Sequence, residues 1–194
     1  MTQAGEKREQ ILAAAVRVFA ERGYEATRIS DIANEAGVAY GLVYHYFGSR
    51  DAIRDAVFRE TWSRMLEAVR TAEQTAGSAP ERLELVVKIV LRAWRDDPDV
   101  VRLIVREVAR SPRLQDELDQ VGAALGTLER IVAVGQQEGT IRASLDPSLC
   151  ARMLYGALEE VLTGWVLGRL PDDVEAVARA EREITRTVIG GLLT

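Results

Sequence analysis

Four rings stand next to one another in the segment AYGLVYHYFGSRDAI, which covers residues 39–53. They belong to Tyr44, His45, Tyr46 and Phe47, in a chain with one histidine and 6% aromatic residues. Tyrosine hydroxyls and an imidazole N–H can donate hydrogen bonds to phosphate oxygens, and the flat rings can lie against sugars or a thymine methyl group. Arg50 follows where a new helix is expected to begin, and a helix N-terminus suits a phosphate. The segment therefore predicts a surface that contacts a nucleic acid.

The residues that precede these rings in the chain must position them. Their pattern predicts two short helices that meet at a tight turn. In ISDIANEAGVAYGLVYHY, residues 29–46, Ala33 is small enough to let a second helix approach closely. Gly37 stands four residues later, where the backbone needs a positive φ, and Val43 points back into the helix pair. This spacing is typical of a helix-turn-helix. A plain hairpin of two helices has the same spacing and is the alternative.

The outward positions of the second helix favour the helix-turn-helix. We expect the inward positions to be Val38, Val43 and Phe47. The positions left on the surface are then Ala39, Tyr40, Leu42, Tyr44 and His45. Packing in a core would account for one or two rings here, but not for three rings together on so short a helix. We therefore interpret this face as a docking surface for DNA.

The composition limits the classes to which the chain can belong. It has 194 residues, a net charge of −5 and one cysteine, Cys150, so a disulfide within the chain is excluded. Residues 1–50 hold six basic and six acidic side chains, and a neutral module can bind DNA if its cations face one way. No apolar run approaches the roughly 18 residues that a membrane helix needs. We therefore expect a cytoplasmic protein without a membrane partner.

Patterns for catalysis and for metal binding are missing from the sequence. His45 and Cys150 are far apart, no Gly-rich phosphate loop follows a strand, and no Ser-centred nucleophile elbow occurs. One histidine and one cysteine are too few for an ordinary protein zinc site. We expect no enzyme activity, no metal and no cofactor. The rival hypotheses are an enzyme and a helical adaptor that does not bind DNA.

Helix signals recur along the whole chain, while the sustained alternation typical of strands is absent. Ser49 can cap a long helix that runs to about residue 76, and three later starts place a capping residue before a proline. These starts are Asp97-Pro98, Ser111-Pro112 and Asp146-Pro147. The sequence predicts an all-α fold of about nine helices.

The segment TRISDIANEAGVAYGLVYHYFGSRDAI resembles the DNA-binding region of TetR-family repressors, and the resemblance spans about residues 7–60. The matching positions are Thr27, Ile32, Ala33, Ala36, Gly37, Val38, Gly41, Tyr44 and Phe47. Arg50 replaces the usual lysine, Tyr46 stands where a histidine is common, and Leu42 replaces a small hydroxyl residue. The resemblance implies that residues 1–50 form a three-helix DNA-binding domain, with a linking helix that starts there. The residues predicted to bind DNA are Thr27, Arg28, Ala39, Tyr40, Gly41, Leu42, Tyr44, His45, Tyr46 and Arg50.

The resemblance also implies that residues 51–194 form a helical domain that binds an effector and makes a homodimer. The residues predicted to bind the effector are Trp94, Leu103, Arg106, Arg110, Leu128, Met153, Tyr155, Glu159 and Trp165. Packing in an ordinary core is the alternative for the apolar ones. Arg102, Arg106 and Arg110 follow one helix face at i, i+4 and i+8. They form either a solvated face or a clamp for the phosphates of a ligand.

Three glycines follow one stripe of the helix expected over residues 147–168. They are Gly156, Gly164 and Gly168, and Glu160 interrupts the stripe. Each glycine costs about 1 kcal/mol in a helix interior, so the close approach of another backbone is a reasonable cause. We predict that these four residues lie at the dimer interface.

Two further segments, VREVARSPRLQDEL and YGALEEVLTGWVL, are similar to the fatty-acid-degradation regulators of this family, called FadR. This resemblance implies a long-chain fatty acyl-CoA as the effector, and a drug-like or other lipophilic ligand is the alternative. The predicted protein is a transcriptional repressor. Its predicted partners are a palindromic operator of double-stranded DNA, a second copy of the chain, and a small hydrophobic effector that releases it from the operator.

Overall fold

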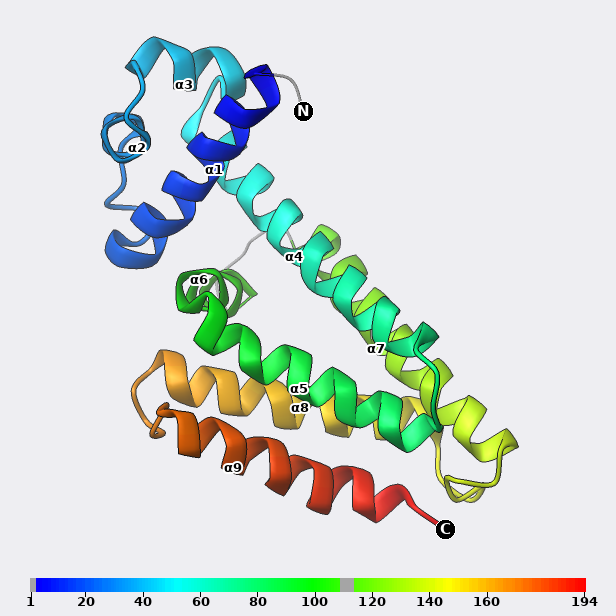
Figure 1. The fold of residues 1–194 in the computed structure, drawn as a ribbon. Helices are drawn as coiled ribbons and strands as arrows, with labels where there is room; N and C mark the ends of the chain where they lie inside the picture. The colour runs from blue at the N-terminus through cyan, green and yellow to red at the C-terminus, as the bar shows by residue number, and fades with distance from the viewer. Residues whose placement is uncertain (1–2, 109–113) are drawn as a thin grey trace.

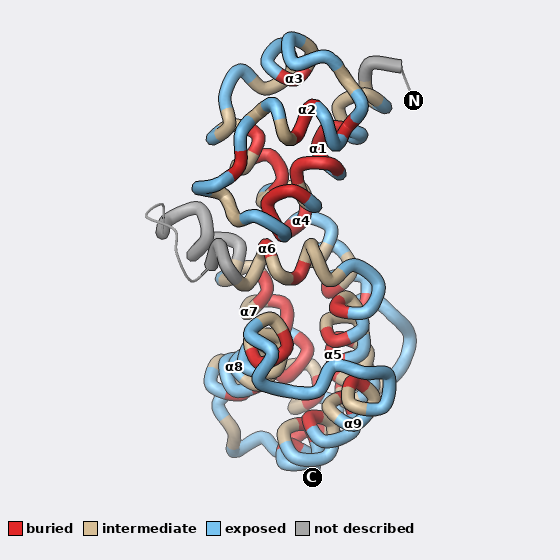
Figure 2. The backbone as a smooth tube through the Cα atoms, turned by 90° about the vertical axis from the view of Figure 1, so that its left-hand side faces the viewer, coloured by how far each residue is buried: buried red, intermediate tan, exposed pale blue. Residues whose placement is uncertain are grey.

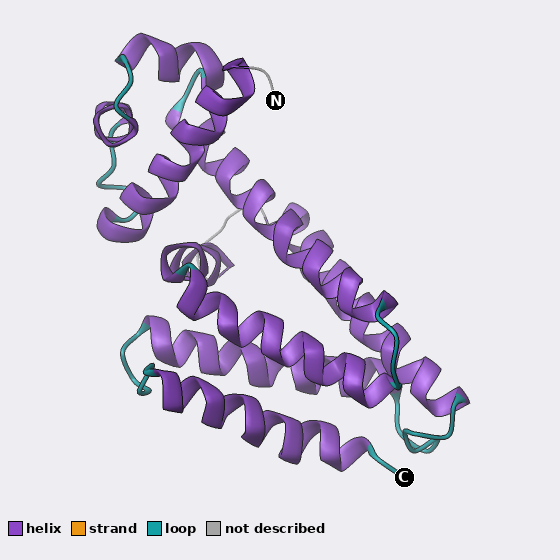
Figure 3. Ribbon diagram, in the orientation of Figure 1, coloured by secondary structure: helices purple, strands orange, loops and turns teal. Residues whose placement is uncertain are grey.

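Nine α-helices and no strand are present in the part of the chain that this computed structural model describes, residues 3–108 and 114–194 (Figure 3). The helices are α1 (Gln3–Arg22), α2 (Ile29–Ala36), α3 (Tyr40–Phe47), α4 (Arg50–Gln74), α5 (Ala79–Asp96), α6 (Pro98–Val108), α7 (Leu114–Gln137), α8 (Pro147–Val166) and α9 (Val174–Ile184). A π-helical turn (Thr185–Ile189) and a 3-10 turn (Gly190–Leu192) continue α9. The predicted fold class is confirmed.

Three helices begin at capping residues that the sequence indicated. The side-chain oxygens of Ser49, Asp97 and Asp146 accept hydrogen bonds of 2.9 to 3.2 Å from backbone N–H groups in the first turns of α4, α6 and α8. Such caps satisfy N–H groups that have no partner within the helix. The start predicted at Ser111-Pro112 lies outside the described residues.

The first three helices and the beginning of α4 enclose a small apolar core at one end of the molecule (Figure 1). Its fully buried side chains include Ile11, Ile32, Val43 and Ile53. Gly37 follows α2 with a φ of 62°, and the Val38 N–H donates to the Ala33 carbonyl at 3.0 Å. This left-handed residue closes the turn between α2 and α3, as the predicted helix-turn-helix requires.

A second, larger core lies among α5, α7, α8, α9 and the distal half of α4 (Figure 1). Near its centre the rings of Trp94 and Trp165 pack with their centroids 6.2 Å apart. Arg92 donates hydrogen bonds of 2.8 and 3.1 Å to the two carboxylate oxygens of Glu181, which joins α5 to α9. Within the described ranges, no helix is both long and apolar enough to span a bilayer.

The short helix α6 lies between the two cores (Figure 2). Leu103 is 5% exposed and belongs to the core of the first three helices, although it comes late in the chain. Val101, two residues earlier, is 2% exposed and belongs to the larger core. One helix therefore supplies side chains to both cores.

Candidate functional site

The outer face of α3 carries most of the residues predicted to bind DNA. Tyr40 and Tyr44 are one turn apart and are 54% and 56% exposed, while Val43 beside them is fully buried. The other predicted residues of this face are Ala39, Gly41 and His45, which are exposed, and Leu42, which is half-buried. The structure thus brings these side chains together on one short helix. Direct contact with DNA stays a prediction.

Three predicted DNA-binding residues lie outside this exposed face of α3. Thr27 is 0% exposed, and its hydroxyl donates to the Gly23 carbonyl at 2.8 Å. The hydroxyl of Thr27 therefore closes the connection between α1 and α2, and contact of this residue with DNA stays a prediction. Tyr46 is half-buried against the apolar core. Arg28 is exposed before α2, where its backbone N–H donates to Asp31 Oδ2 at 2.8 Å.

Arg50 holds the connection between α1 and α2 from the first turn of α4. Its Nη1 donates to the carbonyl oxygens of Tyr24, Glu25 and Thr27 at 3.2, 3.2 and 2.9 Å. The guanidinium lies 4.2 Å from the centroid of the Tyr24 ring, and the Tyr24 hydroxyl donates to Asp51. Arg50 therefore positions the entry to α2, and its predicted contact with a phosphate stays a prediction.

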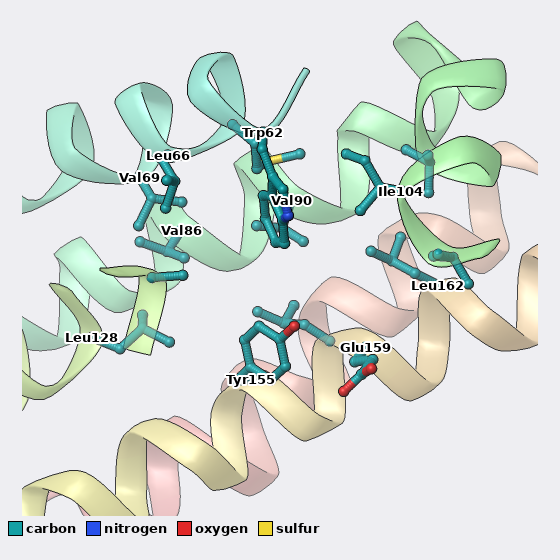
Figure 4. A pocket seen from close by; sticks show the side chains of 15 residues that line it. Trp62, Leu66, Val69, Val86, Val90, Ile104, Leu128, Tyr155, Glu159 and Leu162 are labelled. Atoms are coloured by element: carbon teal, nitrogen blue, oxygen red, sulfur yellow. The ribbon is translucent and has the colours of Figure 1, made fainter. Parts of the chain in front are cut away.

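A pocket of about 90 Å³ lies in the C-terminal part of the molecule, among five helices (Figure 4). It is lined by Trp62, Met65, Leu66 and Val69 of α4, Val86 and Val90 of α5, Val101, Ile104 and Val105 of α6, Ala124 and Leu128 of α7, and Tyr155, Leu158, Glu159 and Leu162 of α8. Three of the predicted effector residues, Leu128, Tyr155 and Glu159, are among them. The lining is suited to a hydrocarbon chain, with a few polar groups that can fix its orientation.

The two polar side chains that α8 contributes to the pocket, Tyr155 and Glu159, have raised pKa values. Burial, with a smaller contribution from Glu159, raises the pKa of Tyr155 to about 12, so its phenol keeps its proton. Burial, with a contribution from Glu160, also raises the pKa of Glu159. Glu159 is exposed although it lines the pocket, so the pocket reaches solvent at this side chain.

Four other predicted effector residues lie away from the pocket lining. Trp94 and Trp165 fill the larger core, Leu103 packs in the core of the first three helices, and Met153 is 52% exposed. The structure places none of these four side chains at the pocket, and their contact with an effector stays a prediction. An apolar residue at helical spacing must be covered, but the spacing does not say whether a core, a ligand or a second chain covers it.

Arg102 is the one arginine of the predicted row whose side chain the structure describes. Arg102 donates to Asp99 Oδ1 at 2.7 Å, and its guanidinium lies 5.1 Å from the centroid of the Trp94 ring. Arg102 therefore already has partners within the chain. The side chains of Arg106 and Arg110 lie outside the described residues.

The residues of the predicted glycine stripe lie in different surroundings. A Cβ on Gly164 would lie 2.6 Å from Leu170 Cδ1, so this glycine makes room for a side chain of its own chain, and its place at a dimer interface stays a prediction. Gly168 follows the end of α8 with a φ of 64°, where a glycine is favoured by the backbone. Gly156 and Glu160 are exposed on α8, and their place at a dimer interface stays a prediction.

Comparison with known families assigns both parts of the chain. Residues 11–57 match the family model of bacterial regulatory proteins of the tetR family, and residues 58–188 match the C-terminal region of YsiA-like protein. The chain belongs to the TetR family. It is a DNA-binding transcriptional regulator, and the resemblance found in its sequence is confirmed.

Relatives of this TetR-family regulator include proteins of fatty acid metabolism. The fatty acid metabolism regulator protein of Bacillus subtilis (strain 168) is 30% identical over 186 residues, which are 95% of this chain and 96% of the relative. The structure of FadR from Bacillus subtilis in complex with stearoyl-CoA has a TM-score of 0.83 and 28% identity, and covers 95% of this chain and 98% of FadR. FadR from Bacillus halodurans has a TM-score of 0.80 and 27% identity, with the same shares covered.

Sequence reasoning missed two residues of this TetR-family chain. Trp62 lines the pocket, and its spacing from Leu66 and Val69, at i, i+4 and i+7, was the signal for a shared buried face. Tyr24 holds the guanidinium of Arg50 over its ring. Its signal was weaker, since an aromatic residue after the end of a helix has many uses.

Proposed function

We propose that this regulator is a cytoplasmic repressor that binds a palindromic operator as a homodimer and is released when a long-chain fatty acyl-CoA enters the pocket. The observation that carries this proposal is the apolar pocket itself, which shares α6 with the core of the DNA-binding helices. The complex of the similar Bacillus subtilis FadR with stearoyl-CoA supports the choice of ligand.

The small volume of the pocket supports a mechanism in which ligand binding changes the affinity for DNA. Its volume of about 90 Å³ is smaller than the roughly 150 Å³ cavity that accommodates benzene, so a long chain can enter only if the lining helices move apart. Both α4 and α6 line the pocket and also pack against the first three helices. A ligand that prefers the expanded arrangement would therefore shift the positions of the two recognition helices in a dimer.

The exposed face of α8 supports a dimer. Leu149 and Met153 are 55% and 52% exposed, and they lie with Gly156 and Glu160 at i, i+4, i+7 and i+11 along one side of the helix. The glycine leaves open space above its backbone, which a helix of a second copy can approach closely. A twofold dimer would present its two α3 helices to half-sites about one turn of DNA apart.

Introducing a charge into this face should separate the dimer. We expect Met153→Glu to give a monomer at micromolar concentration, because the new carboxylates would meet without partners at the symmetric interface. The control is Lys88→Glu, which adds a carboxylate to the exposed face of α5. Light scattering after gel filtration gives the mass, and a Met153→Glu dimer of unchanged stability would contradict this interface.

The function is tested by operator release. Genomic DNA captured by the purified protein and sequenced should give a palindrome, and stearoyl-CoA should lower affinity for that duplex at least tenfold, within the usual range of allosteric coupling. Free CoA should have much less effect. Failure to bind any duplex at low salt would overturn the repressor, whereas operator binding that acyl-CoA leaves unchanged would overturn only the effector.

A further inference from the structure

Trp62 carries a buried polar group that the fold does not use. The side chain is 6% exposed, and its Nε1 has no hydrogen-bond partner among the described residues. A buried indole N–H usually has a partner, because leaving it unpaired costs free energy. Trp165 follows this rule, since its Nε1 donates to the Pro171 carbonyl at 2.9 Å. The unpaired N–H of Trp62 therefore requires an explanation.

The position of Trp62 points to a ligand. Its ring extends from α4 into the pocket, and Tyr155 extends from α8 on the opposite side with its hydroxyl directed toward the indole (Figure 4). Both groups are hydrogen-bond donors at neutral pH, and the raised pKa keeps the phenol protonated. Val69, Val86 and Leu128 line the part of the pocket away from Glu159, and they offer no polar atom (Figure 4).

We infer that the Trp62 Nε1–H and the Tyr155 hydroxyl donate to one carbonyl oxygen of the effector, the thioester carbonyl of an acyl-CoA. The acyl chain then extends toward Leu128, where the lining is a hydrocarbon surface. A carbonyl oxygen has two lone pairs, so it can accept from both donors at once. This inference rests on the proposed function and goes beyond it, because it assigns the atoms that recognise the ligand.

The charge of the pocket favours a neutral carbonyl over a carboxylate. Glu159 lines the same pocket, and Glu160 follows it. An anionic carboxylate between these donors would lie near a second carboxyl group, which is unfavourable in an apolar surrounding. A thioester offers the same acceptor oxygen without the charge. The pocket is therefore suited to the activated acyl group rather than to the free fatty acid.

The test compares a thioester with a thioether of equal length. Palmitoyl-CoA and S-hexadecyl-CoA differ only in the carbonyl oxygen, and calorimetry gives the Kd of each for the full-length protein. We expect wild-type protein to bind the thioester about tenfold more tightly, as one or two hydrogen bonds allow. In Trp62→Phe, which keeps an aromatic ring but loses the N–H, the two affinities should differ by less than threefold.

Control variants distinguish an effect on ligand recognition from an effect on folding. Trp165→Phe removes an N–H that lies outside the pocket lining, so it should keep the tenfold preference even if it lowers stability. Trp62→Phe loses packing of the larger ring but also removes an unpaired buried donor, and because the two effects oppose each other we expect the variant to remain folded without ligand. Tyr155→Phe supplies a second, independent variant with the same expected loss of preference.

The possible outcomes distinguish a failure of the carbonyl assignment from a failure of the proposed acyl-CoA effector. Equal wild-type affinities for thioester and thioether would overturn the carbonyl assignment and leave the proposed function standing. Retention of the preference in both Trp62→Phe and Tyr155→Phe would also overturn the assignment. Binding of neither compound to wild-type protein would overturn the acyl-CoA effector and this inference with it.

Discussion

Arg50→Ala is expected to weaken binding to the operator about hundredfold, and Arg50→Lys is expected to recover little of that loss. The guanidinium donates to three carbonyl oxygens between α1 and α2 and lies over the Tyr24 ring. The two hydrogens of Nη1 are shared among the three carbonyls, and because a hydrogen bond from a charged group contributes about 1.5–3 kcal/mol, losing them should loosen the entry to α2. Lysine keeps the charge but cannot reproduce the planar fork.

The control is Arg59→Ala, which removes the same charge from an exposed position on the same helix. Fluorescence anisotropy with a labelled operator over a range of salt concentrations measures both the affinity and its salt dependence. If Arg50 also binds a phosphate, the slope of log K against log salt should fall by about one in Arg50→Ala. Full binding by Arg50→Lys would mean that only the charge is needed and would contradict the positioning role.

Leu103→Ala is expected to lower the free energy of unfolding by about 3 kcal/mol and to uncouple the effector from DNA. Leu→Ala changes at buried positions cost about 2–5 kcal/mol, because apolar surface is no longer buried and a cavity is left. Leu103 is 5% exposed in the core of the DNA-binding helices, although it belongs to α6. A weaker contact there should let α6 move without moving the first three helices.

The neighbouring position provides the matched control. Ile104 lines the pocket, so Ile104→Ala should weaken binding of acyl-CoA while the ligand that does bind still releases the operator. Leu103→Ala should show the reverse, with ligand binding kept and release reduced. Denaturation in urea gives the stability, and operator binding with and without palmitoyl-CoA gives the response. Normal release by Leu103→Ala would mean that the coupling runs through α4 instead.

Features that depend on neighbouring residues in the chain were predictable. The caps at Ser49, Asp97 and Asp146 and the left-handed Gly37 follow from side chains and backbone within a few residues of one another. The exposed face of α3 was predictable for a similar reason, since Val43 identifies the buried side of a helix of only eight residues. Short-range chemistry determines these features.

Features that depend on which surfaces meet were not predictable. Leu103 and Ile104 are adjacent and both apolar, yet one enters the DNA-binding core and the other lines the pocket. Met153 has the spacing of a core residue and is exposed. Thr27 matched a family motif, which says that the residue type is needed but not whether its hydroxyl meets DNA or the Gly23 carbonyl.

The close contact between Gly164 and Leu170 predicts that the two positions vary together among homologues. Leu170 Cδ1 lies 2.6 Å from the place that a Cβ of residue 164 would take, which is too close for two carbon atoms, and Leu170 belongs to the connection from α8 to α9. A homologue with alanine or a larger residue at position 164 should therefore carry a smaller side chain at position 170. In an alignment of homologues, the volumes of these two side chains should vary inversely, and designed changes at either position should be made in pairs.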